Sequence, residues 1–293
     1  MEMRAFGRTG LSVSALGLGA GPLGDAALSD VQAGRIVHAA LDLGVTLIDT
    51  ARSYGASEER IGRALVARRE RAVLSTKVGY GIEGVEDWTG EAVRRGIEEA
   101  LRKLRTEWID VVHLHSCPVE TLRRGEVTEA LAEAVRAGKV RVASYSGENE
   151  ALDWAVASGL FGAVEMSVSP WDQGAIDRTL WRAKERGLGV IAKRALGNAW
   201  WRFEERPSAP DVAEYWERGR AMGAIEGEMG RGEMSVRFAA FTWGVDSAIV
   251  GTTRTEHLAE LAQAVGKGRL PEDAVRRVRA GFRARGAGWR GVI

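Results

Sequence analysis

The sequence predicts a (β/α)₈ barrel, because short β-rich runs alternate with amphipathic helical stretches along its 293 residues. The runs are mostly near-continuous apolar segments, as expected for parallel strands that are buried on both faces. Such a barrel takes about 250 residues, so the length leaves room for insertions. The eight predicted strands are Ser12–Leu18, Thr46–Asp49, Ala72–Lys77, Ile109–His115, Val140–Ser146, Ala163–Val168, Gly189–Lys193 and Ser247–Val250.

The segments between the predicted strands carry helical periodicity. Val93, Ile97 and Ala100, for example, fall on one face of a helix. Ser57 and Thr255 precede such segments and are predicted to cap them. These patterns supply the helices that surround a barrel.

Three further segments complete the predicted fold. Residues 3–14 contain Gly10 between two short runs and indicate a hairpin that closes the barrel bottom. Residues 198–212 indicate a long loop with an extra helix behind it, and residues 271–285 a basic terminal helix. Because no linker or composition break interrupts the alternation, we expect one domain over residues 1–293.

The composition excludes several classes of protein. Hydrophobic residues make up 45% and charged residues 28%, which is ordinary for a globular protein with a sizeable core. The 41 basic and 40 acidic residues give a net charge of +1, without the lopsided basic surface that nucleic-acid or membrane binding needs. Cys117 is the only cysteine, no signal-peptide core is present, and no apolar stretch approaches the ~20 residues that span a bilayer. We expect a soluble, cytoplasmic protein.

Four ionisable side chains stand at or just after the ends of three successive predicted strands: Asp49, Tyr54, Lys77 and His115. The loops after the strands of a barrel open onto one face, where catalytic groups gather. Each residue alone has a simpler explanation, such as a capping carboxylate for Asp49 or a half-buried loop tyrosine for Tyr54. A lysine that closes an apolar strand is costly unless it is paired. Together the four predict proton donation by Tyr54, with a pKa that Lys77 lowers.

The other candidate nucleophiles and ligands near the fourth strand are weaker. His113 and His115 share a strand face; His115 lies nearer the rim, and His113 is predicted to be a packed interior residue. No pair of histidines has zinc-ligand spacing with further support, so no metal site is expected. Cys117 could pair with His115, but a bystander thiol is favoured because nothing nearby supplies a third, orienting group.

A glycine-rich segment, Gly19–Gly24, satisfies G-x-G-x-x-G after a strand, and Asp49 follows at the end of the next strand. In a dinucleotide-binding Rossmann unit the helix begins within this motif, so that its N-terminus faces the pyrophosphate. Here the expected cap is Ser29 or Asp30, which starts the helix too late. A loop at the active site is the favoured interpretation.

Four stretches resemble the aldo-keto reductases of the bacterial type, and the resemblance runs over nearly the full length. They are the run Asp-Thr-Ala-Arg-Ser-Tyr-Gly-Ala-Ser-Glu from Asp49, Ser-Thr-Lys-Val-Gly around Lys77, Ile109-Asp110 with His115 five residues on, and Gly-Lys-Val-Arg at residues 138–141. The resemblance implies a (β/α)₈ barrel that binds NADP(H) in an extended pose without a Rossmann fold. It also implies that Tyr54 is the general acid, that Lys77 lowers its pKa and pairs with Asp49, and that His115 orients the substrate carbonyl.

The cofactor residues implied by the resemblance include several departures. Ser146 matches a carboxamide-binding serine, but Gly147 replaces the asparagine usually after it, and Glu165 occupies the usual glutamine position. Lys193 stands where a tyrosine usually stacks on the nicotinamide. The full set expected to bind the cofactor is Gly19, Ala20, Asp49, Ser146, Glu165, Lys193, Arg194, Gly251, Thr252, Thr253, Arg254, His257 and Glu260.

These observations predict an NADP-dependent oxidoreductase that reduces small aldehydes or ketones, or runs the reverse reaction. NADP(H) is expected over NAD(H), because Arg254 can contact a 2′-phosphate beside a helix start. Two alternatives remain: a non-enzymatic NADP(H)-sensing subunit on the same barrel, and an isomerase or lyase that uses Lys77 as a Schiff-base amine. Among the ten tryptophans, Trp171 and Trp201 follow strands and are predicted to line an apolar pocket for aromatic or lipophilic carbonyls.

Overall fold

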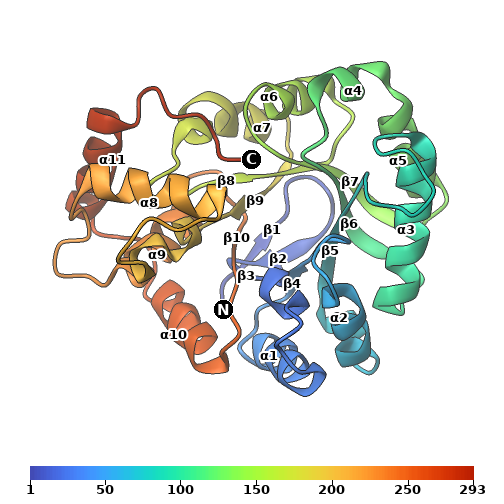
Figure 1. The fold of residues 1–293 in the computed structure, drawn as a ribbon, viewed down its shortest axis with the longest axis horizontal. Helices are drawn as coiled ribbons and strands as arrows, with labels where there is room; N and C mark the ends of the chain where they lie inside the picture. The colour runs from blue at the N-terminus through green and yellow to red at the C-terminus, as the bar shows by residue number, and fades with distance from the viewer.

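Eight parallel strands form a closed barrel in the computed structural model of residues 1–293, in the order β10-β3-β4-β5-β6-β7-β8-β9 (Figure 1). The predicted barrel is confirmed, and neighbouring strands in the chain are neighbours in the ring. The strands are β3 (Leu16–Gly19), β4 (Leu47–Asp49), β5 (Val73–Val78), β6 (Ile109–His115), β7 (Val140–Ser146), β8 (Ala163–Ser167), β9 (Gly189–Lys193) and β10 (Ser247–Val250).

The first predicted strand is wrong in its extent. Residues 12–18 divide at Ala15: β2 (Ser12–Ser14) pairs antiparallel with β1 (Met3–Ala5), and only β3 enters the barrel. The Ser14 hydroxyl donates to the carbonyl of Leu16 at 2.6 Å, which holds the chain at this division. Phe6 and Val13, from the hairpin, pack in one cluster with interior strand residues. The hairpin therefore closes one end of the barrel, as predicted, and leaves the other end for a site.

Helices surround the barrel in Figure 1. None of them is both long and apolar enough to cross a membrane. They are α1 (Asp30–Asp42), α2 (Ser57–Leu65), α3 (Gly90–Leu104), α4 (Val119–Arg124), α5 (Glu126–Arg136), α6 (Asn149–Ser158), α7 (Trp181–Glu185), α8 (Pro210–Met222), α9 (Arg231–Phe241), α10 (Thr255–Gly266) and α11 (Glu272–Arg285).

The helix starts explain two details of the sequence. Ser29 caps α1 through a capping box with Gln32, so the helix begins well after the glycine-rich segment, and Gly21–Gly24 forms a short 3₁₀ turn instead. The prediction that Ser57 and Thr255 are N-caps is wrong, because Ser57 is the first residue of α2 and Thr255 the first residue of α10. The Ser57 hydroxyl is used elsewhere: it donates to the carbonyl of Ala20 at 2.8 Å.

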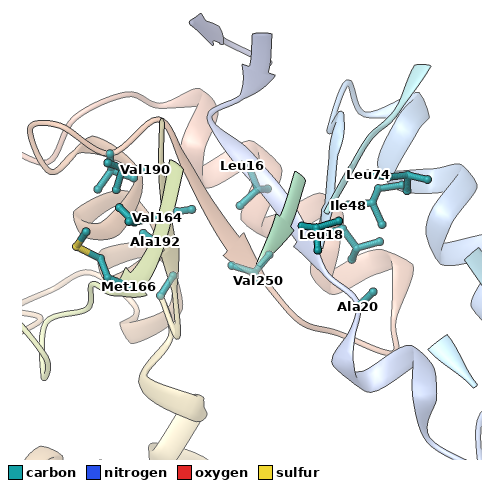
Figure 2. Packing of buried hydrophobic residues seen from close by; sticks show 14 of the residues in the cluster. Leu16, Leu18, Ala20, Ile48, Leu74, Val164, Met166, Val190, Ala192 and Val250 are labelled. Atoms are coloured by element: carbon teal, nitrogen blue, oxygen red, sulfur yellow. The ribbon is translucent and has the colours of Figure 1, made fainter. Parts of the chain in front are cut away.

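Alternation along the strands separates two environments. Outward residues such as Leu18, Ile48 and Leu74 belong to the main hydrophobic core between barrel and helices (Figure 2). Inward residues form layers, as in other barrels of this type. The lower layer is apolar, and the positions two residues further along the strands are polar, except for Gly251 after Ile249. The apolar layer consists of Leu47, Val111, Val142, Ala163, Ile191 and Ile249.

Candidate active site

A buried ion pair lies at the ends of β4 and β5. The Lys77 ammonium donates to the carboxylate of Asp49, and to the carbonyl of Thr50 at 2.9 Å. Both side chains are at most 2% exposed. Burial alone lowers the pKa of Lys77, but the charges of Asp49 and Glu165 outweigh it and raise that pKa above its usual value. Lys77 is therefore a fixed cation.

Tyr54 lies beside this cation, in the turn after β4. Lys77 Nζ is 5.3 Å from the centre of the Tyr54 ring, and the His115 ring meets that ring edge-on at 6.0 Å. The prediction that the pKa of Tyr54 is lowered is wrong, because the sum of all influences raises it. Lys77 exerts the largest single influence and lowers the pKa, but burial and the carboxylates of Asp49 and Glu165 together raise it. In this environment Tyr54 holds its proton.

His115, at the end of β6, has a partner that the sequence interpretation missed. The Tyr80 hydroxyl contacts His115 Nδ1 at 2.9 Å and Ser53 Oγ at 3.2 Å, and the Tyr80 ring stacks on the imidazole at 5.6 Å. Burial lowers the pKa of His115 to about 3, so the ring is neutral at physiological pH. With Nδ1 held by Tyr80, Nε2 is the nitrogen left for a ligand. The sequence feature that could have identified Tyr80 is its position three residues after Lys77.

A polar cluster lies beneath these residues, on top of the apolar layer. Ser75 Oγ donates to Asp49 at 2.7 Å and contacts His113 Nε2 at 2.8 Å. His113 is fully buried, as predicted, and burial lowers its pKa to about 4. Ser75 therefore connects the two buried groups through one hydroxyl.

Glu165, on β8, completes the cluster. It accepts a hydrogen bond from Ser146 Oγ at 3.0 Å and lies 3.6 Å from Lys77 Nζ. Burial and the charge of Glu165 raise the pKa of Asp49 to about 7, despite Lys77. Asp49, His113 and Glu165 lie close enough to hold a metal ion, but the Lys77 ammonium already sits against both carboxylates.

A cavity of about 740 Å³ opens above the cluster, where the barrel strands end. The chain terminus, Ile293, also reaches this cavity, and Figure 1 draws the C-terminus near the centre of the ring. Ten of its 22 lining residues carry polar or charged side chains other than tyrosine, so the wall combines polar and apolar groups. The predicted site residues that line it are Gly19, Asp49, Tyr54, His115, Glu165, Lys193, Arg194 and Gly251.

The remaining predicted cofactor residues lie outside this wall. Ser146 is one hydrogen bond away through Glu165. Ala20 is fully buried. Thr252, Thr253, Arg254, His257 and Glu260 continue from Gly251 into the start of α10.

The start of α10 gathers cationic side chains. His257 Nδ1 contacts Thr252 Oγ1 at 3.2 Å, and Thr252 Oγ1 accepts from the backbone N–H of Arg254 at 3.1 Å. Burial lowers the pKa of His257, and the charges of Arg254 and Arg202 act in the same direction. Arg202, which lines the cavity from the segment after β9, was missed because only the folded chain brings it to α10.

The prediction that tryptophans line the pocket is wrong. No tryptophan is among the residues of the cavity wall. Trp171 is fully buried and packs against Trp200 and Trp201, with ring centres 5.4–5.6 Å away. These rings belong to a second hydrophobic cluster that joins the segment after β9 to α8, α9 and α11. The hypothesis of a tryptophan-lined substrate site therefore fails.

Two departures from the family pattern have local explanations. Lys193 Nζ is paired with Glu148 at 3.0 Å, so its charge is balanced. A Cβ atom at Gly147 would come within 2.3 Å of the Tyr145 hydroxyl oxygen. That hydroxyl donates to the carbonyl of Cys117 at 3.1 Å, and no side chain fits at residue 147 without moving it.

Cys117 faces the core rather than His115. Its side chain belongs to the main hydrophobic cluster, and burial raises the pKa of the thiol to about 12. A nucleophilic cysteine needs a lowered pKa and some access. The bystander role is the one that this environment supports.

Comparison with known proteins agrees with the fold. The family model "Aldo/keto reductase family" matches residues 15–281. L-galactose dehydrogenase of Arabidopsis thaliana is 32% identical over 210 residues, which cover 67% of this chain and 66% of that protein. 6-Dehydroglucose reductase of Novosphingobium aromaticivorans is 28% identical over 288 residues, covering 89% and 90%. The holo form of an aldo-keto reductase of Bacillus halodurans has the same fold, with a TM-score of 0.83 at 23% identity and 96% of each chain covered. Because the family model spans most of its length, the chain belongs to the aldo/keto reductase family.

Proposed function

We propose that this protein is an NADP(H)-dependent oxidoreductase that interconverts a small carbonyl compound and its alcohol, with Tyr54 as the general acid. The single observation that carries the proposal is that Tyr54 and His115 line one cavity, with Lys77 Nζ 5.3 Å from the centre of the Tyr54 ring. A nicotinamide cofactor would supply the hydride. The protein would position the carbonyl and deliver the proton.

The residues present fit a nicotinamide. Oε2 of Glu165 is buried and has no hydrogen-bond partner, although buried polar atoms are nearly always paired. An acceptor left open in this way suits the amide N–H groups of a carboxamide. At the other end, Arg202 and Arg254 lie near His257 and suit a phosphate. A dinucleotide that reaches from β8 to α10 would offer a carboxamide to Glu165 and a phosphate to Arg202 and Arg254.

Each remaining catalytic group has a distinct role in this proposal. Tyr54 keeps its proton because burial and the neighbouring carboxylates raise its pKa, and Lys77 stabilises the phenolate once the proton has left. Neutral His115 donates from Nε2 to the substrate oxygen and orients it, in the tautomer in which the Tyr80 hydroxyl donates to Nδ1 rather than to Ser53. Asp49 holds Lys77 in place through their ion pair.

The polar side chains in the cavity wall favour hydroxylated substrates over lipophilic ones. Ser53, Asn198 and Asp211 line it together with the catalytic groups. Polar side chains reject ligands that leave them unpaired. The names of two relatives, an L-galactose dehydrogenase and a 6-dehydroglucose reductase, point to sugar chemistry in those proteins. We therefore propose polyhydroxylated aldehydes, ketones or alcohols as the substrate class.

The Schiff-base alternative finds little support in the geometry. An amine must be neutral to attack a carbonyl, whereas Lys77 is buried against a carboxylate and its pKa is raised. Borohydride in the presence of a carbonyl substrate should leave Lys77 unmodified.

The proposed acid is tested with Tyr54→Phe. We expect turnover to fall about 10²–10⁴-fold, because the proton donor is lost, with NADPH affinity unchanged. Steady-state rates on a panel of sugar aldehydes and benzaldehyde-type compounds would measure turnover. Titration of cofactor fluorescence would measure the affinity for NADPH. A variant that keeps more than a tenth of wild-type turnover would show that Tyr54 is not the acid. Tight NADPH binding without turnover on any carbonyl would favour the sensing subunit.

A further inference from the structure

Glu165 places a second carboxylate beside one ammonium, that of Lys77, which already pairs with Asp49. The Glu165 side chain is 1% exposed, and one oxygen accepts from Ser146 while the other has no hydrogen-bond partner. Such an arrangement is costly unless a further group compensates the open oxygen. The open oxygen is therefore an observation that points to a ligand.

The charges around Glu165 leave a negative excess. From β5, Lys77 lies 3.6 Å away, and from β6, the neutral ring of His113 lies 3.7 Å away. From β4, Asp49 already takes the ion pair with Lys77. Lys193, on β9, is balanced by Glu148. With both Asp49 and Glu165 ionised, one ammonium faces two carboxylates.

We infer that Glu165 makes this site bind the oxidised, cationic nicotinamide in preference to the reduced, neutral ring. The inference rests on the proposed function, because hydride transfer requires the ring to lie beside Tyr54 and His115 in the cavity that Glu165 also lines. A carboxylate that attracts a nearby cation where the effective dielectric constant is ~20 changes an affinity by about tenfold to hundredfold. A glutamine at this position would offer the same carboxamide partner without that charge.

The preference has a kinetic consequence. In the reductive direction the oxidised cofactor is a product, so its tighter binding makes it a strong inhibitor that competes with NADPH. In the oxidative direction the same complex is the productive one. Glu165 thus favours the complex from which alcohols are oxidised.

The test is the ratio of two dissociation constants, for NADP⁺ and NADPH, measured by calorimetry on the intact protein at pH 8.5. At that pH Asp49 is ionised, so a change at Glu165 is not offset by Asp49. We expect the wild type to bind NADP⁺ more tightly, and Glu165→Gln to move the ratio about tenfold or more towards NADPH. A tenfold shift corresponds to about 30 mV in the potential of the bound two-electron couple. Glu165→Asp, which keeps the charge, should retain the wild-type preference.

Glu129→Gln, an exposed substitution of the same chemistry on α5, is the matched control and should leave the ratio at the wild-type value. If neither NADP⁺ nor NADPH binds, the proposed function itself is overturned. Binding of both, with the same ratio in wild type and Glu165→Gln, would overturn only the role of Glu165. If Glu165→Gln does not fold, the wild-type ratio decides: equal or weaker affinity for NADP⁺ contradicts the inference.

Discussion

At the scale of single residues, the site depends on groups whose neighbours set their protonation. Tyr54, Lys77 and His115 could be predicted because each closes or follows an apolar strand. The net charge around these three residues could not be predicted, because it depends on how the carboxylates of Asp49 and Glu165 share the ammonium of Lys77. For that reason the expected direction of the Tyr54 pKa failed while the placement of Tyr54 succeeded.

Tyr80 offers a test at this scale. In Tyr80→Phe the ring still stacks on His115, but the hydroxyl that contacts Nδ1 is lost. We expect the neutral imidazole to lose its preference for a proton on Nε2, and kcat/KM to fall about fivefold, since a neutral hydrogen bond contributes about 1 kcal/mol. Nitrogen-15 chemical shifts of the His115 ring would report the tautomer, with Ser53→Ala as the control. An unchanged tautomer ratio would show that Tyr80 does not set it.

At the scale of elements, the strand and helix arrangement followed from periodicity, whereas loop positions did not. Outward apolar residues and inward layers are both consequences of strand alternation. Trp171 and Trp201 stand after strands, as Tyr54 does, yet they pack into a separate cluster with α8, α9 and α11. Position after a strand places a residue near the rim but does not decide whether it turns inward or outward.

The start of α10 carries the cofactor prediction. Arg254 is exposed there, next to His257, and backbone N–H groups at a helix start favour an anion. Arg254→Ala should weaken NADPH binding about tenfold and leave NADH binding nearly unchanged, because only NADPH carries the 2′-phosphate. Dissociation constants from fluorescence titration check this. Equal constants for the two cofactors in the wild type, unchanged in the variant, would assign Arg254 to the solvated surface.

At the scale of the whole molecule, buried titratable groups make opposing contributions to stability. His113 and His115 have lowered pKa values of about 4 and about 3, so the unfolded chain binds more protons and their contribution is lost as the pH falls below 6.5. Asp49 and Asp172 have raised pKa values of about 7 and about 6, so their contribution is lost as the pH rises from 3.8. Between pH 4.5 and 6 the two pairs nearly cancel.

Removing one of the two histidines should leave the contribution of Asp49 and Asp172 to the pH dependence of stability only partly cancelled. In His113→Gln, one histidine opposes two carboxyl groups, so the free energy of unfolding should decrease with rising pH by about 1.4 kcal/mol per pH unit. The wild type should be nearly flat over the same interval. Urea unfolding at pH 4.5, 5.2 and 6 gives the two slopes. Equal slopes for both proteins would mean that His113 is protonated to the same extent in the folded and unfolded chains.

The separate packing of the tryptophans has an optical consequence. The indole N–H groups of Trp171 and Trp200 are buried without hydrogen-bond partners, and both rings lie in the cluster formed with α8, α9 and α11. Indoles without polar contacts emit at shorter wavelengths than solvated ones. Intrinsic emission from this cluster therefore reports the loosening of the C-terminal helices, and the protein carries a local optical probe of that region.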